Sequence, residues 1–140
     1  MTTSIDSNIL IALWDKDDAL NTLAQSALDS TFRHGNLVVS APVYAELLAY
    51  PVRSEGFLDA FFRDSGIVVD WNLDEAVWRA AGLAFRSYSA RRRGEREAGP
   101  RRILADFLIG SHAAHNGFAL LTLDDRLFRA AFPRLSITAI

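Results

Sequence analysis

Apolar residues in this chain of 140 residues form two alternating patterns. In some places they make short uninterrupted runs, which are typical of buried strands, and in others they recur every three or four positions, as on one face of a helix. The short runs predict strands at residues 3–5, 37–39, 67–70, 118–121 and 135–140. The helical stripes predict helices that contain residues 9–14, 20–28, 43–50, 57–62, 77–88, 103–116 and 125–131.

The order of these elements indicates the fold class. Strands alternate with helices, and strands that are apolar throughout are typical of a parallel sheet that is buried on both faces. A chain of this length can bury one core, and it contains no internal repeat or linker. We therefore expect a single domain over residues 1–140, with a three-layer α/β/α fold around a central, mainly parallel sheet of about five short strands.

Four acidic residues lie at or soon after the places where predicted strands and helices meet. Asp6 ends the first strand, and Glu46 lies in the second turn of the helix after the second strand. Asp106 lies in the first turn of its helix, and Asp124 follows the strand that contains ALLT. In open parallel sheets, ligands bind outside the carboxyl ends of the strands. The pattern therefore favours one acidic site at that edge of the sheet.

Each of these acids also has a purely structural interpretation. An N-cap aspartate stabilises a helix start by about 1 kcal/mol, which suits Asp6 and Asp124, and first-turn acids such as Glu46 and Asp106 respond to the helix dipole. Their shared location favours a site, because carboxylates packed within a few ångströms repel one another unless a cation is present. Mg²⁺ takes oxygen ligands and keeps waters for chemistry, so it suits such a group.

The helix around Asp106 carries small residues and two histidines. Gly110 and Gly117 lie on the same face as Asp106, which predicts a close approach of this helix to the sheet. At 100° per residue, His112 and His115 are turned away from Asp106 by roughly 120° and 180°. We therefore expect both histidines at the surface or facing a partner, and neither as a ligand beside Asp106.

Composition and charge narrow the function classes. The formal net charge is −2, yet six of the fourteen arginines lie in residues 91–102 (RRRGEREAGPRR), so only this segment would attract nucleic acid. No cysteine is present, which excludes disulfides and thiolate metal sites and fits a reducing cytosol. No apolar run approaches the ~20 residues of a membrane span. MTTSID also lacks a secretory signal's basic region, so we expect a cytoplasmic protein without a membrane partner.

Four segments together resemble the PIN-domain ribonucleases, most closely the VapC toxins of bacterial and archaeal toxin–antitoxin pairs. They are IDSN at residues 5–8, PVYAEL around Glu46, RRILADFLIGSHAAHNG around Asp106 and LLTLDDRLF around Asp124. The resemblance covers nearly the whole chain and keeps the order of the acids. The arginine-rich segment before Asp106 departs from the family, which generally has a shorter and less charged approach there.

The resemblance implies a ribonuclease site that uses a divalent cation. Asp6 and Asp106 would coordinate Mg²⁺, or Mn²⁺, directly, and Glu46 and Asp124 would bind it through water or hold a second ion. The family's Thr-x-Asp spacing assigns the fourth position to Asp124, which leaves Asp125 as a solvated acid in the first turn of the next helix. The implied reaction is hydrolysis of an RNA phosphodiester by a metal-activated water, with 5′-phosphate and 3′-hydroxyl ends.

The resemblance also implies assisting groups around the acids. Asn8 and Thr122 match the polar positions that orient a carboxylate or the attacking water. A charge run is usually a solvated face, but it can also hold RNA phosphates beside a nuclease site. The candidates for that role are Arg91, Arg92, Arg93, Arg101 and Arg102.

Protein partners follow from the same resemblance. A VapB-like antitoxin is expected to hold the protein inactive by laying its C-terminal segment over an apolar groove near the site. The candidates for lining that groove, which also fit an ordinary core, are Trp14, Leu20, Leu23, Phe57, Phe61 and Phe62. Similar proteins usually form homodimers, so we expect one here.

Other function classes compete with this hypothesis. A catalytically silent PIN module that binds RNA or protein would typically have lost acids, whereas all four are present. A phospho-aspartyl protein, such as a receiver or a haloacid dehalogenase, needs a lysine at a later strand end. Lys16 is the sole lysine, and it lies between the first two predicted helices. No GxxxxGK phosphate loop is present, which excludes a nucleotide-driven motor.

Overall fold

A five-stranded sheet forms the centre of the computed structural model, which describes residues 1–140 apart from 52, 96–102 and 140. Its strands are paired in parallel in the order β3-β2-β1-β4-β5. In chain order they are β1 (Thr2–Ile5), β2 (Asn36–Ser40), β3 (Val68–Asp70), β4 (Ala119–Thr122) and β5 (Ile137–Ala139). The predicted parallel sheet of short strands is confirmed.

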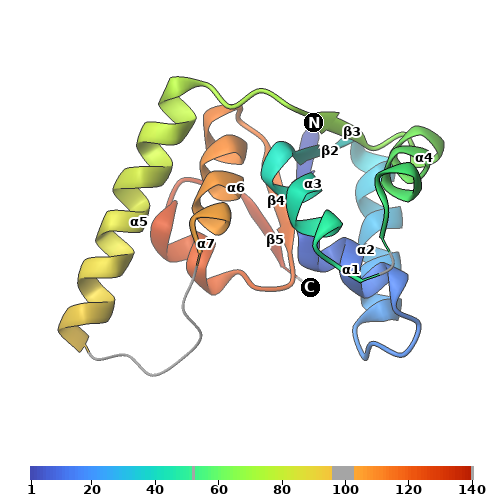
Figure 1. The fold of residues 1–140 in the computed structure, drawn as a ribbon, viewed down its shortest axis with the longest axis horizontal. Coiled ribbons are helices and arrows are strands. Elements are labelled where there is room, and N and C mark those ends of the chain that lie inside the picture. Colours follow the sequence, from blue (N-terminus) through green and yellow to red (C-terminus); the bar gives the residue numbers. More distant parts are fainter. Residues whose placement is uncertain (52, 96–102, 140) are drawn as a thin grey trace.

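Helices connect the strands and cover the sheet. They are α1 (Ser7–Trp14), α2 (Asn21–His34), α3 (Ala41–Leu48), α4 (Glu55–Ser65), α5 (Glu75–Glu95), α6 (Leu104–His115) and α7 (Arg126–Ala131). Figure 1 shows the sheet in the middle, with α5 and α6 on one side and α2 and α4 on the other. The three-layer α/β/α expectation is therefore confirmed. Among the described residues, no helix is long and apolar enough to cross a membrane.

Local sequence signals explain where several helices begin and end. Ser40 precedes α3, and Pro42 stands in its first turn, where a missing backbone N–H is tolerated. The Ser54 hydroxyl accepts a hydrogen bond from the Phe57 N–H and so caps α4. Gly66 ends α4 in the left-handed conformation, with φ at 78°, which glycine adopts without steric penalty.

The strand order reverses between β1 and β4, and this reversal positions the site. The chain builds the sheet outward from β1 through β2 to β3, then crosses back to place β4 on the other side of β1. The carboxyl ends of β1 and β4 therefore lie side by side at the reversal, where open α/β sheets bind their ligands. Asp6 directly follows β1, and Thr122 is the last residue of β4.

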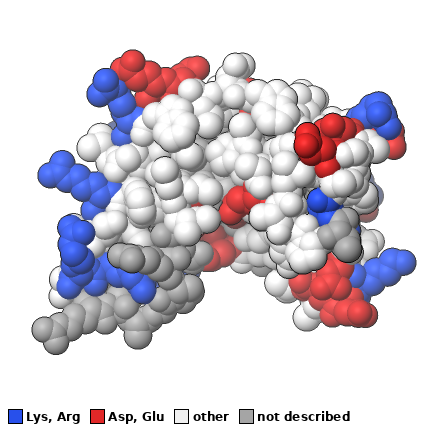
Figure 2. Space-filling view, in the orientation of Figure 1, with Lys and Arg blue, Asp and Glu red and all other residues white. Residues whose placement is uncertain are grey.

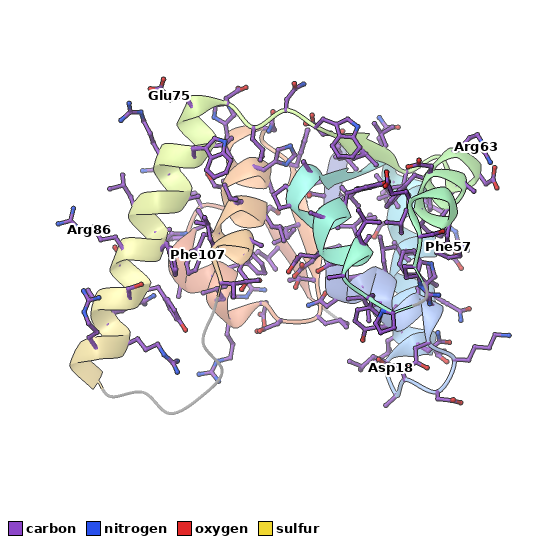
Figure 3. The ribbon with its side chains drawn as sticks, viewed as in Figure 1. Asp18, Phe57, Arg63, Glu75, Arg86 and Phe107 are labelled. Carbon is purple, nitrogen blue, oxygen red and sulfur yellow. The ribbon has the colours of Figure 1, made fainter. Side chains whose placement is uncertain are left out.

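Two apolar clusters hold these elements together. The larger surrounds the sheet and includes fully buried residues of β1, β2 and β4, such as Ile5, Val39 and Leu120. The smaller joins α5, α6 and α7 around Phe107, which is completely buried. Phe107 lies between α5 and α6 in Figure 3. Because it immediately follows Asp106, its packing fixes the first turn of α6.

Candidate active site

Three of the four predicted acids come together from separate elements at the strand ends. Asp6 follows β1 and is only 5% exposed, Glu46 projects from α3, and Asp106 lies in the first turn of α6. Both Asp106 and Glu46 are close enough for their charges to raise the pKa of Asp6. Figure 2 shows acidic side chains in the middle of this face, between the α6 and α3 positions of Figure 1.

Asp6 is held by hydrogen bonds on both carboxylate oxygens. Its Oδ1 accepts from the Ser7 N–H at 2.8 Å, and its Oδ2 accepts from the Thr122 hydroxyl at 2.8 Å. The pKa of Asp6 is raised to about 6, chiefly by burial; the hydrogen bonds from Thr122 and Ser7 oppose this rise, and the charges of Asp106 and Glu46 add to it. The carboxylate is therefore fixed in position, and these two hydrogen bonds offset only part of the effect of burial on its pKa.

Glu46 is tied to Asp6 through a residue that the sequence did not single out. The Ser7 hydroxyl donates to Glu46 Oε1 at 3.0 Å and lies 3.5 Å from Asp6 Oδ1. Burial raises the pKa of Glu46, the Ser7 hydrogen bond opposes that rise, and the charge of Asp106 adds to it. The only sequence signal for Ser7 is its place between Asp6 and the polar Asn8.

Asp106 also has a structural role at the start of its helix. Its Oδ2 accepts a hydrogen bond from the Ile103 N–H at 3.3 Å, which closes the first turn of α6. This contact and the neighbouring Phe107 set the direction of the Asp106 side chain. The structural interpretation of Asp106 as a first-turn acid therefore holds together with its place near Asp6.

Thr122 and Asn8 join the end of β4 to the start of α1. The Thr122 Oγ1 accepts from the Asn8 side-chain amide at 3.4 Å and from the Asp124 N–H at 3.1 Å. Asn8 Oδ1 in turn accepts from the Leu123 N–H at 3.2 Å. Both predicted assisting residues therefore lie in one hydrogen-bonded unit with Asp6.

The fourth acid is connected to this unit through its backbone. Asp124 is half-buried, and the charges that raise the pKa of Asp6 are those of Asp106 and Glu46. The role of the Asp124 side chain stays a prediction. Asp125 differs from it, because its Oδ2 accepts a 2.6 Å hydrogen bond from Arg129 on α7, and it is the N-cap of that helix and not a first-turn residue.

The predicted RNA-binding arginines fall into two groups. Arg91 and Arg93 are exposed near the end of α5, whereas Arg92 is half-buried and its guanidinium donates to the Tyr88 hydroxyl at 3.4 Å. Arg101 and Arg102 lie outside the described residues.

The donor chemistry of the site fits a hard cation. Asp6, Glu46 and Asp106 supply only carboxylate oxygens, which are the ligands that Mg²⁺ and Mn²⁺ prefer. In the described parts of the chain, no group of three or more His, Asp or Glu side chains is already arranged so that it could hold a metal ion. The carboxylates are therefore neighbours, without forming a closed coordination shell.

His112 corrects the expectation that both histidines lie at the surface. It is completely buried, and its Nε2–H donates to Asp70 Oδ2 at 2.8 Å. Burial raises the pKa of Asp70, but hydrogen bonds from the Asn72 N–H and from His112 outweigh it and lower the pKa overall. His115 is exposed as expected, 3.2 Å from Asp74. His112 therefore anchors the far end of α6 to β3.

Gly110 also differs from its predicted role. A Cβ atom there would lie 2.4 Å from the Phe132 ring and 3.1 Å from Phe128, so the missing side chain makes room for aromatic rings at α7 and just beyond it. The predicted close approach to the sheet is therefore wrong at Gly110, whose close neighbours are this aromatic pair. Gly117 serves the turn after α6 instead, with φ at 70°.

Replacing His112 with alanine is expected to lower the free energy of unfolding by about 2 kcal/mol, because it opens a buried space and leaves Asp70 without its histidine partner. His115→Ala is the matched control, since it removes an exposed histidine–aspartate contact worth under about 0.5 kcal/mol. Urea unfolding of both variants measures the difference. Equal stabilities would show that the His112–Asp70 contact does not anchor α6.

Comparison with known proteins gives a family and a set of structures with this fold. A sequence model of the family described as "PIN domain" matches residues 4–133. No curated protein matches the chain at a significant level. Similar solved structures include VapBC2 from Rickettsia felis bound to promoter DNA, with 18% identity and a TM-score of 0.64 over 100% of this chain and 99% of that one. VapBC-1 from nontypeable Haemophilus influenzae has 19% identity and a TM-score of 0.64, covering 99% and 98% of the two chains. FitAcB from Neisseria gonorrhoeae has 20% identity and a TM-score of 0.62, covering 96% and 95%.

Proposed function

The chain belongs to the PIN-domain family, and from this premise we propose that it is a metal-dependent endoribonuclease, the toxin of a VapBC-type toxin–antitoxin pair. The observation that carries the proposal is the convergence of Asp6, Glu46 and Asp106 at the reversal of strand order. Nothing in the packing of the core requires three carboxylates there, and their repulsion opposes folding. A catalytic use of the carboxylates explains why they are kept together.

A divalent cation is the proposed cofactor, with Mg²⁺ favoured and Mn²⁺ as the alternative. Asp6 and Asp106 would hold it directly, and Glu46 and Asp124 would bind it through water or hold a second ion. A cation would offset the repulsion that contributes to the raised pKa values of Asp6 and Glu46. When bound, such an ion polarises the scissile phosphate and lowers the pKa of a coordinated water.

The protein's own groups would position this chemistry. The Thr122 hydroxyl and the Ser7 N–H keep the two Asp6 oxygens fixed. Glu46, whose pKa burial raises, is suited to accept the proton of an attacking water. Asn8 would orient the segment after β4 through the Leu123 N–H, so that Asp124 faces the cation.

An antitoxin segment and a second copy of the chain are the proposed protein partners. Three apolar side chains, one directly before α2, one on α2 and one on α4, stay partly exposed: Leu20 at 37%, Leu23 at 49% and Phe57 at 39%. Trp14 is half-buried beside Phe57, and their ring centroids are 5.3 Å apart. This surface would accept the antitoxin segment. Phe62 is buried and belongs to the core instead.

The purified chain is expected to cleave single-stranded RNA with Mg²⁺ or Mn²⁺, to stop when EDTA removes the ion, and to resume when the ion is restored. The reason is that the carboxylates alone cannot stabilise the charge that develops on the phosphate. Gel analysis of end-labelled RNA measures cleavage and the chemistry of the new ends. Cleavage that continues in EDTA would contradict the proposed cofactor. RNA binding without any cleavage would favour the silent PIN module.

A further inference from the structure

Nearly the whole of α5 carries a basic surface, of which only Arg91, Arg92 and Arg93 at its end are already candidates for RNA binding. From Ala76 to Gly94 the chain contains five arginines and no aspartate or glutamate, although the whole protein carries a net charge of −2. Figure 2 shows basic side chains along the margin of the molecule that α5 forms in Figure 1. Five of the fifteen Lys and Arg residues of the chain therefore lie on this one helix.

Three of these arginines form a line on the outer side of α5. Arg79, Arg86 and Arg93 are spaced by seven residues, or nearly two helical turns, so they lie on one face about 10.5 Å apart. The opposite face carries Val77, Ala81 and Tyr88, which are buried against α6 and α7. Arg86 points away from the body of the molecule in Figure 3.

This line is available to a ligand. All three arginines are exposed, and within the described parts of the chain neither Arg86 nor Arg93 has a carboxylate within ion-pair distance. Arg79 contacts Glu75 at 2.6 Å, in an exposed pair that a phosphate can replace at little cost. No side chain projects from Gly82, which lies between Arg79 and Arg86, and the space around it is open because a Cβ there would meet nothing within 4 Å.

The line leads toward the acids. Ser111 on α6 donates to the Val77 carbonyl at 2.7 Å, and Phe107 packs against Tyr88 with ring centroids 5.5 Å apart. The two helices are therefore antiparallel, and the Arg93 end of α5 lies at the same end as the first turn of α6, which carries Asp106. The shared apolar cluster holds this line in a fixed position relative to the catalytic edge.

We propose that the outer face of α5 binds the phosphate backbone of single-stranded RNA, with Arg79, Arg86 and Arg93 as successive phosphate contacts that guide the strand to the acidic site. This proposal rests on the proposed ribonuclease function and names the path of its substrate. Trp78 is 48% exposed beside Arg79 and provides a ring on which a base stacks at the far end of the path.

Charge also distinguishes RNA from a second copy of this chain as the occupant. A symmetric contact between two α5 helices would bring two arginine lines together, with only Glu75 and Glu95 at the ends of the helix to offset them. A polyanion gains from the same arrangement, because each arginine that meets a phosphate releases a condensed counterion.

The test measures binding of a labelled single-stranded RNA of about 12 nucleotides in EDTA, so that the RNA stays intact. Arg79→Gln/Arg86→Gln is compared with Arg33→Gln/Arg63→Gln, which also removes two exposed arginines, from α2 and α4, one of them paired to a nearby acid. We expect the α5 variant to bind about tenfold more weakly at low salt, with a logarithmic salt slope shallower by about 1.4, and the control to match the wild type.

A second pair of variants separates stacking from charge. Trp78→Ala is expected to weaken binding at least about fivefold without changing the salt slope, whereas Trp71→Ala, which removes another exposed indole, leaves both unchanged. If the two tryptophan variants behave alike, the stacking contact is wrong.

Cleavage of the same RNA in Mg²⁺ distinguishes this proposal from the proposed function. Cleavage by the wild type together with equal binding by the two arginine variants would overturn the α5 path and leave the nuclease intact. Binding that depends on Arg79 and Arg86 in a chain that never cleaves would support the path and overturn the nuclease.

Discussion

RNA cleavage is expected to fall about a thousandfold or more when Asp6 or Asp106 is replaced by asparagine. Each substitution keeps the size and shape of the side chain but removes a negative charge that the proposed cation needs. At Asp6 the amide can still satisfy its neighbours, because the Thr122 hydroxyl has an alternative acceptor in the Asp124 carbonyl at 3.3 Å. Initial rates of RNA cleavage in Mg²⁺, together with thermal unfolding, separate lost chemistry from lost structure.

The chain provides a matched control for this prediction one residue from the fourth acid. Asp125→Asn makes the same chemical change at a carboxylate that is bound to Arg129, so it should leave cleavage near the wild-type rate. Asp124→Asn should lower cleavage strongly if Asp124 holds the cation. Undiminished cleavage by Asp6→Asn or Asp106→Asn would end the proposed mechanism. If Asp124→Asn and Asp125→Asn lost cleavage activity equally, the assignment of the fourth ligand to Asp124 and not to Asp125 would be wrong.

The sheet edge could be predicted from the sequence because it depends on short-range signals. Each strand is a short apolar run, and Asp6 and Thr122 are placed simply by where β1 and β4 end. The parallel arrangement then brings those ends together whatever the details of packing. This is why the neighbourhood of Asp6, Glu46 and Asp106 follows from residue order, although no single segment specifies it.

Ser7 and His112 depend on packing between elements, which periodicity does not report. The Ser7 hydroxyl reaches Glu46 only because α3 packs beside α1. The angle of His112 from Asp106 predicts a surface position only if α6 has a single buried face. The structure buries every residue from Phe107 to Ala113, because neighbouring elements surround α6. A helix buried on all sides has no outer face for a histidine to occupy.

The geometry of the acidic site implies that function and stability oppose each other at Asp6. The carboxylate is almost completely buried, faces two other acids, and has its pKa raised to about 6. In the absence of a cation, the folded protein at neutral pH must hold this charge where the unfolded chain would expose it to water. Hydrogen bonds from Ser7 and Thr122 offset only part of the penalty.

Asp6→Asn is therefore expected to stabilise the metal-free protein by about 3 kcal/mol at pH 7, although the same substitution is expected to lower cleavage. The pKa of Asp6 is about 6 in the folded state and 3.8 in the reference state, a difference of about two units at 1.36 kcal/mol each. Between these two values the folded state binds more protons than the unfolded state, so wild-type stability falls as pH rises through this window and is level above it. The amide cannot titrate, so the variant should lack this fall.

Urea unfolding in EDTA from pH 4 to pH 8 measures the effect. Asp125→Asn is the control: its free energy of unfolding should fall with pH as in the wild type, because Asp6 still titrates in this variant. Mg²⁺ should then restore stability to the wild type at pH 7 and do little for Asp6→Asn, because only the charged carboxylate gains from the ion. Two results would contradict this prediction. The free energy of unfolding of the wild type could rise across this pH range, or Asp6→Asn could be less stable than the wild type at pH 7. Either result would mean that the protein itself compensates the buried carboxylate, which then needs no cation.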